Sequence, residues 1–393
     1  MVNPSAEIDW HYPRTALAQG YLGTLRAGLI SSLVLFAPRR KGKTEFLLDD
    51  LLPAAEAAGY LTVYCSMWQN RSDPLAALLA ALAEAAKPKT LGAKLQHRLL
   101  RPFKKTSLEF ELSHVGKVKA EAEFNAKDGG SQAQLQRLPE LIDSVVAASK
   151  GKVLIAFDEI QHLAKPEFQE LVAALRTTLD VRKKTVKTIF TGSSRNRLQM
   201  MFSQIKAPLF QFSQSTDFPE LDAGFVAFMA GAFKQATGRE LLLEQANAAF
   251  LALGSTPGLF HDAVERVMKM GGVDIAGVAQ GVLAEAREAS GYAQRLMEMR
   301  PLDREVIRVI VARAPLYTDE TRTRLALAIG LGGEPLSARQ VQVAVERLLA
   351  EQIIYQVGRG VYEIEDHQLG EWLMAAPQMM GGGDMESDEP LAP

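Results

Sequence analysis

The chain has 393 residues, 44 of them lysine or arginine and 46 aspartate or glutamate, which gives a formal net charge of −2. This length has room for two or three domains, and a hydrophobic fraction of 47% is ordinary for a folded protein. The composition excludes a disulfide scaffold, because Cys65 is the only cysteine in the sequence. The near balance of charge argues against a uniformly basic nucleic-acid-binding surface but leaves a local basic patch open.

The N-terminus lacks the basic start and apolar core of a secretory signal. The apolar stretch at residues 27–37 is much shorter than the ~20 residues that a membrane helix needs. We therefore expect no membrane segment. A single cysteine fits a reducing compartment, so we expect a cytoplasmic protein.

Short apolar runs alternate with helical patterns along the first half of the chain. Runs typical of buried strands occupy residues 33–36, 60–65, 153–157 and 186–191. Apolar residues at helical spacing predict helices over residues 45–58, 74–86, 135–146 and 166–180. Strands that alternate with helices form βαβ units, so the expected fold class is α/β, with a parallel sheet flanked by helices.

Residues 87–130 interrupt this alternation, and we interpret them as an insertion. The stretch from Lys87 to Lys105 carries seven lysines or arginines and no acid, and residues 107–124 alternate in the manner of a β-hairpin. The basic residues are candidates to follow a nucleic-acid backbone or to contact an acidic partner, and a solvated surface is the alternative. These candidates are Arg98, Arg101, Lys104 and Lys105.

The strand pattern stops near residue 218. Residues 222–290 predict helices with a break at residues 254–258. Further helices are predicted at residues 302–313, 318–329 and 337–352, followed by an alternating stretch at 353–364. The last residues, 377–393, contain three consecutive glycines, three prolines and four acids, which predicts a disordered tail.

A basic, glycine-containing loop joins the first predicted strand to the first predicted helix. Residues 37–44 match the pattern G-x-x-x-x-G-K-[ST], except that Ala37 replaces the first glycine. In such a loop the backbone N–H groups bind phosphate oxygens, Lys43 reaches the β- and γ-phosphates, and Thr44 binds Mg²⁺. A chance basic turn is the alternative, and the flanking strand and helix argue against it. The residues expected to bind ATP are Pro38, Arg39, Arg40, Lys41, Gly42, Lys43, Thr44 and Glu45.

Two carboxylates follow the apolar run at residues 153–157. Carboxylates at the end of a parallel strand open onto the ligand crevice, so we expect Asp158 to hold Mg²⁺ and Glu159 to orient and polarise the attacking water. A turn with a helix-capping aspartate is the alternative. The phosphate loop, which precedes these acids by roughly 115 residues, favours the catalytic interpretation.

The fourth predicted strand ends in small polar residues followed by arginines. We expect Ser193 or Ser194 to contact the γ-phosphate or the attacking water. Arg195 or Arg197 would stabilise charge in the transition state, within one subunit or on its neighbour. A solvated loop with a helix-capping serine stays open as the alternative.

Together these residues resemble the P-loop ATPases of the AAA+/STAND group, and most closely the archaeal-type ATPase family. The resemblance rests on Pro38–Thr44, on the strand ends Phe157–Gln161 and Gly192–Ser194, on a loose Gly-x-Pro match at Gly254–Gly258, and on a winged helix at residues 300–375. It covers most of residues 14–375. The family likeness implies that ATP lies between core and lid, that nucleotide state controls lid position or assembly, and that Trp10 to Arg14 contact the adenine.

The same resemblance implies a chain of four parts. These are a P-loop ATPase core over residues 1–217 with the insertion at about 87–130, an all-α lid over 218–295, a winged-helix domain over 296–376, and a tail over 377–393.

In the predicted winged helix, Ser337 begins a helix on which Arg339 and Arg347 would be exposed, as on a recognition helix. Arg359 would lie at the tip of the wing. However, residues 290–375 hold ten arginines, no lysine and 12 acids, a net charge of −2. Because DNA affinity depends mostly on phosphate neutralisation, DNA binding and the docking of a protein partner both stay open.

We therefore predict a slow, Mg²⁺-dependent ATPase that acts as a switch. Its nucleotide state would control assembly into a homo-oligomer or binding of a partner, and DNA is one candidate partner. The alternative is a signalling or scaffold protein that hydrolyses ATP seldom or not at all and docks a protein partner through its winged helix.

Overall fold

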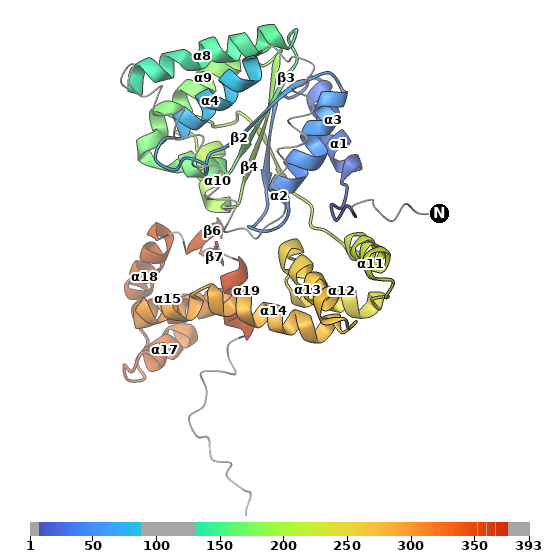
Figure 1. The fold of residues 1–393 in the computed structure, drawn as a ribbon. Coiled ribbons are helices and arrows are strands. Elements are labelled where there is room, and N and C mark those ends of the chain that lie inside the picture. The colour runs from blue at the N-terminus through green and yellow to red at the C-terminus, as the bar shows by residue number, and fades with distance from the viewer. Residues whose placement is uncertain (1–7, 88–130, 352, 359, 366, 376–393) are drawn as a thin grey trace, which may run out of the picture. The chain divides into compact units, whose positions relative to one another are not determined.

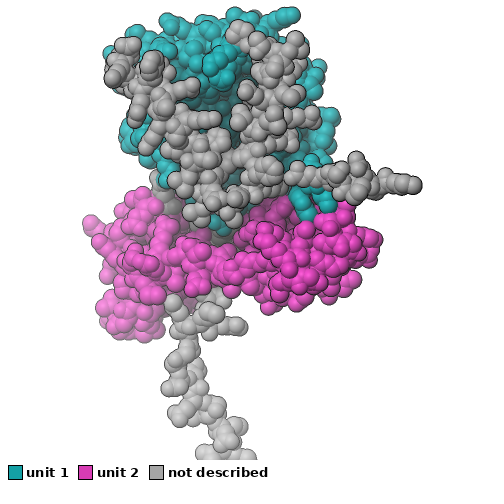
Figure 2. Space-filling model, in the orientation of Figure 1, with its two compact units in different colours: residues 1–221 teal, residues 222–393 magenta. Residues whose placement is uncertain are grey.

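The computed structural model describes residues 8–87, 131–351, 353–358, 360–365 and 367–375. The chain divides into two compact units, residues 1–221 and residues 222–393 (Figure 1 and Figure 2). None of the helices among the described residues is long and apolar enough to cross a membrane.

Among the described residues, the first unit is built on a five-stranded parallel sheet with the strand order β2-β3-β4-β1-β5. The strands are β1 (Ser32–Phe36), β2 (Leu61–Ser66), β3 (Val153–Asp158), β4 (Val186–Gly192) and β5 (Gln214–Asp217). The four strands predicted from apolar runs are confirmed, each to within one residue at either end. Because all five strands run the same way, the residues that follow β1, β3 and β4 meet at one edge of the sheet.

Strand β5 is missing from the sequence prediction. Its residues, Gln-Ser-Thr-Asp, contain no apolar side chain. Among the described strands it pairs with β1 alone, from Leu33 opposite Gln214 to Phe36 opposite Asp217. An edge strand is held by backbone hydrogen bonds to a single neighbour and needs no apolar pattern. Periodicity therefore carries no signal for such a strand.

Helices pack on both faces of the sheet (Figure 1). In chain order they are α1 (Thr15–Arg26), α2 (Lys43–Glu45), a π-helical turn (Phe46–Leu51), α3 (Leu52–Ala57), α4 (Pro74–Ala86), α8 (Ser131–Ala148), α9 (Gln169–Val181) and α10 (Arg195–Phe202). Alternate residues of β3 point to opposite faces. Val153, Ile155 and Phe157 join the core with α4, α8 and α9, whereas Leu154 and Ala156 join the core with α1 and α3.

The second unit is mainly helical, as its sequence predicts. Its helices are α11 (Ala223–Thr237), α12 (Leu243–Ala252), α13 (Pro257–Met270), α14 (Ile275–Ala289), α15 (Tyr292–Glu298), α16 (Pro301–Val311), α17 (Asp319–Ala328), α18 (Ala338–Ala350) and α19 (His367–Ala375). An antiparallel hairpin of β6 (Ile354–Gly358) and β7 (Val361–Ile364) follows α18. Helices α16, α17 and α18 and this hairpin share one hydrophobic core.

The ring of Phe157 lies at the centre of the sheet's larger core and provides a test of its packing. It is 0% exposed and stacks on Phe190 with ring centroids 5.0 Å apart. We expect Phe157→Ala to lower the free energy of unfolding by about 3–5 kcal/mol, because a buried cavity is left. Val181→Ala, at a side chain that is 79% exposed, should change it by less than about 0.5 kcal/mol. Urea unfolding measures both, and equal losses would contradict the packing described.

Candidate functional site

The loop after β1 is tied to the end of β4 and ends in a glycine with a left-handed backbone. The Ala37 N–H donates to the Gly192 carbonyl at 3.4 Å. Gly42 has φ +81°, a conformation that glycine adopts without strain, and its carbonyl accepts the Phe46 N–H at 2.9 Å. The loop therefore leads directly into α2, whose first N–H groups point back toward the loop.

Lys43 is buried within this loop. Its side chain is 5% exposed, and its Nζ donates to the Ala37 carbonyl at 2.6 Å and to the Pro38 carbonyl at 2.7 Å. Burial lowers the pKa of Lys43 from 10.5 to about 8, although the nearby carboxylates of Glu159 and Asp158 oppose this shift. The ammonium group thus lies in a poorly solvated place, with neutral carbonyl oxygens as its hydrogen-bond partners.

Asp158, at the end of β3, is bonded by side chains from three other elements. Its Oδ2 accepts the Thr44 hydroxyl at 2.6 Å and the Tyr64 hydroxyl at 3.0 Å, and its Oδ1 accepts the Thr191 hydroxyl. The backbone N–H of Glu159 also donates to Oδ1 at 3.0 Å. The carboxylate is only 2% exposed, so these donors replace the water that burial removes.

Glu159 adopts a left-handed backbone, with φ +54° and ψ +39°. Its carboxylate accepts hydrogen bonds from the Ser193 hydroxyl, at 2.9 Å, and from the Gln161 side-chain amide. The predicted catalytic residues Glu159 and Ser193 therefore touch each other, across the ends of β3 and β4. Positive φ in a residue with a side chain is uncommon and concentrates at functional sites.

The residues after Ser193 lie at the start of α10. The Ser194 hydroxyl accepts the Arg197 N–H at 3.3 Å, so this serine caps the helix, which is the structural role left open by the sequence. The guanidinium of Arg195 lies over the Phe36 ring, 4.2 Å from its centroid. Arg195 thus stays beside the carboxyl end of β1.

Two of the other cations of the loop, Lys41 and Arg39, have identified partners. Lys41, whose side chain is 8% exposed, forms an ion pair with Glu220 at 2.9 Å. The Arg39 guanidinium lies 5.4 Å from the centroid of the Trp68 ring, just beyond the end of β2. Arg40 is exposed and has φ +63°.

The N-terminal segment docks on the helix that follows the loop. His11 Nδ1 lies 3.0 Å from Glu45, and His11 Nε2 lies 3.2 Å from Asp50, which also accepts the Arg14 N–H at 2.8 Å. Burial lowers the pKa of His11, but its contacts with Glu45 and Asp50 outweigh burial and raise the pKa from 6.5 to about 9. Glu45, predicted to bind nucleotide, therefore holds an imidazolium.

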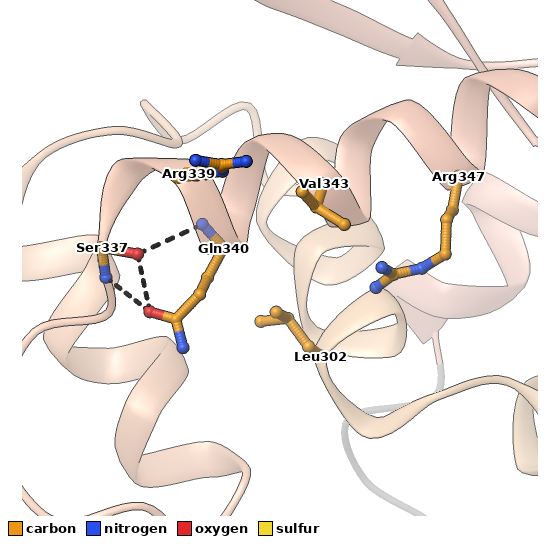
Figure 3. Close-up of a pocket in the computed structure, with 6 residues that line it drawn as sticks. All are labelled: Leu302, Ser337, Arg339, Gln340, Val343 and Arg347. Atoms are coloured by element: carbon orange, nitrogen blue, oxygen red, sulfur yellow. Dashed lines mark hydrogen bonds between the residues drawn. The ribbon is translucent and has the colours of Figure 1, made fainter.

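In the second unit, the two arginines predicted for a recognition helix differ in their surroundings. Arg347 donates through Nε to Asp303 Oδ2 at 3.1 Å and through Nη2 to Oδ1, and Asp303 is 5% exposed. Arg339 is exposed near the start of α18, after the cap formed by Ser337. Figure 3 shows both arginines beside a shallow pocket of about 320 Å³, with Val343 between them and Leu302 across the pocket. The charge of Arg347 is thus matched by a carboxylate of its own unit.

The other nucleic-acid candidates, Arg98, Arg101, Lys104, Lys105 and Arg359, lie outside the described residues, as does the hairpin predicted at residues 107–124.

Three polar residues of the site were given no role by the sequence, since Tyr64 and Thr191 donate to Asp158 and Gln161 donates to Glu159. His11 lies in the segment Trp10 to Arg14, which was expected at the adenine, and in this structure it contacts Glu45. Thr191 and Tyr64 lie on the two strands adjacent to β3, so knowledge of the strand order would have placed them beside Asp158. The contact of His11 joins residues 34 positions apart, and no local pattern predicts it.

Two solved structures resemble the whole chain. A Walker-type ATPase of Pyrococcus abyssi matches with a TM-score of 0.59 and 17% identity, over 94% of this chain and 96% of the other. The ORC2 protein of Aeropyrum pernix in its ADP form matches with a TM-score of 0.54 and 14% identity, over 98% of this chain and 97% of the other. The chain has the fold of these P-loop proteins. No family model and no curated protein sequence matches it significantly.

The docking of His11 predicts a pH dependence of stability. Its pKa is about 9 in the folded protein, against 6.5 as the ordinary value, so the stabilisation is complete below pH 6.5 and is lost as the pH rises through about 9. We expect the difference in melting temperature between wild type and His11→Asn to be largest near about pH 6 and to shrink toward about pH 9.5. A difference that stays constant over this range would contradict the ion pairs described.

Proposed function

We propose that the chain binds ATP together with Mg²⁺ at the carboxyl edge of the sheet and hydrolyses it. The observation that carries this proposal is the 2.6 Å hydrogen bond between Thr44 and Asp158, residues 114 positions apart. This hydrogen bond joins the phosphate loop to the acidic end of β3. Lys43 precedes Thr44 in the chain, and Glu159 follows Asp158. The P-loop fold and this meeting of four residue types support ATP as the substrate.

Lys43 would bind the terminal phosphates of ATP. Its Nζ now bonds two neutral carbonyls, and its buried position lowers its pKa to about 8. Phosphate oxygens carry full charge and would stabilise the ammonium form far better than carbonyl oxygens do. Backbone N–H groups of residues Arg39 to Glu45 would bind the remaining phosphate oxygens.

Thr44 and Asp158 would hold the metal. Mg²⁺ prefers oxygen ligands, and the hydroxyl and carboxylate oxygens of these residues already lie 2.6 Å apart. Their donor set therefore fits a magnesium site. A bound Mg²⁺ neutralises charge on the phosphates.

Glu159 would orient and polarise the attacking water as general base. Ser193, which bonds its carboxylate at 2.9 Å, would share in positioning that water. Ser194 and Arg195 lie next along the chain, and Arg195 would add positive charge near the transferred phosphoryl group.

ATP turnover at this site would serve as a switch. In this proposal residues 218–295 form the lid and residues 296–376 a winged helix, and nucleotide state controls assembly or the binding of a protein or DNA partner. The helices of the second unit and the hairpin after α18 support this division. The acidic composition of residues 290–375 and the pairing of Arg347 with Asp303 favour a protein over DNA at the winged helix.

Lys43→Ala tests nucleotide binding. We expect at least a tenfold loss of ATP affinity in isothermal calorimetry with Mg²⁺, because a charge-assisted contact to phosphate worth about 1.5–3 kcal/mol is removed. Lys165→Ala is the matched control, since this lysine side chain is 43% exposed and should leave affinity unchanged. Equal ATP affinity of wild type and Lys43→Ala, or no binding by either, would overturn the proposal.

Glu159→Gln separates binding from hydrolysis. The substitution preserves size but removes the charge that polarises water, so kcat should fall by about 10²–10⁴-fold while ATP affinity is retained. Phosphate release at saturating ATP measures kcat. Unchanged turnover would remove Glu159 from this role, and a wild type that binds ATP without turnover would favour the scaffold function instead.

A further inference from the structure

The side chain of Gln161 forms a closed set of hydrogen bonds with two proposed catalytic residues. Its Nε2 donates to the Glu159 carboxylate and, at 3.0 Å, to the Ser193 hydroxyl, while its Oε1 accepts the Ser193 N–H at 3.4 Å. The Ser193 hydroxyl in turn donates to Glu159 at 2.9 Å. Gln161 is 3% exposed, so each polar atom of its amide is used inside the protein.

The position of this amide depends on a glycine. A Cβ atom built on Gly192 would lie 2.7 Å from Gln161 Oε1 and 2.9 Å from Leu198 Cδ2. Both distances are shorter than real Cβ contacts, and the amide could not stay in its present place beside any larger residue. The last residue of β4 therefore provides the space that Gln161 occupies.

The backbone of Glu159 is fixed as well as its side chain. Its left-handed conformation is flanked by two hydrogen bonds, from the Glu159 N–H to Asp158 Oδ1 and from the His162 N–H to the Glu159 carbonyl, each 3.0 Å long. Gln161 lies in the short 3₁₀-helix, Ile160–Ala164, that this turn begins. The Glu159 carboxylate is thus held by groups at the end of β3 and by Ser193 at the end of β4.

We propose that Gln161 is a positioning residue for Glu159: its amide, seated in the space left by Gly192, fixes the carboxylate against Ser193 and so sets the direction from which the attacking water is polarised. This inference rests on the proposed ATP hydrolysis. Gln161 acts through Glu159 and does not itself touch the nucleotide. Its contribution is orientation and the support of negative charge on the carboxylate by an N–H donor.

Gln161→Leu and Gly192→Ala test the proposal from two directions. The first removes the amide, and the second keeps the amide but displaces it. We expect either to lower kcat by about tenfold or more while the calorimetric ATP affinity stays unchanged, because the catalytic carboxylate is misplaced and neither residue is among those proposed to bind ATP. Gln169→Leu, an exposed glutamine on α9, is the matched control.

A purely structural role would lower stability and leave the kcat of the folded protein unchanged, and that result, or a matching loss of ATP affinity, would overturn the proposal. A double-mutant cycle with Glu159→Ala, followed by urea unfolding, needs no ATP turnover. Gln161→Leu should destabilise the wild type more than it destabilises Glu159→Ala, and equal losses would show that Gln161 does not hold Glu159. If the wild type fails to bind or hydrolyse ATP, the proposed function fails, while the cycle still decides the contact between these two residues.

Discussion

A buried carboxyl group that needs hydrogen-bond donors is the constraint on which the site depends. Asp158 is 2% exposed, and the side chains that bond it come from the helix after β1, from β2 and from β4. Leaving such a group without donors would cost several kcal/mol, so the strand order and the side-chain donors are needed together. The same carboxylate fixes the relative positions of Thr44 and Glu159, since one bonds it and the other follows it in the chain.

The sequence predicted those parts of the structure that have a local pattern. The apolar runs of β1 to β4 and the spacing of the loop before Lys43 are such patterns, and Asp158 and Glu159 follow from the end of one run. The polar edge strand β5 has no pattern of this kind. Thr191 became part of the site only through its strand neighbour, because its partner Asp158 lies 33 residues away in the sequence. Gln161 lies near Glu159 in the chain, but its other partner, Ser193, lies 32 residues away.

In the second unit, too, a buried carboxyl group has a partner. Arg347 is held by Asp303, which is nearly buried, and a charge paired in this way costs less to bury than one left alone. An arginine count therefore overstates the positive charge that α18 offers to a partner. Arg339, exposed beyond the helix cap, contributes more to that surface than Arg347 does.

The two carbonyl contacts of Lys43 would make the proposed ATP site selective for highly charged anions. Ala37 and Pro38 compete with any arriving anion for the same ammonium group, at 2.6 and 2.7 Å. A weakly charged ion, such as chloride, gains little by displacing two well-formed hydrogen bonds, whereas a polyphosphate brings several charged oxygens at once. In the proposed function, the loop would thus require a high charge density in its ligand.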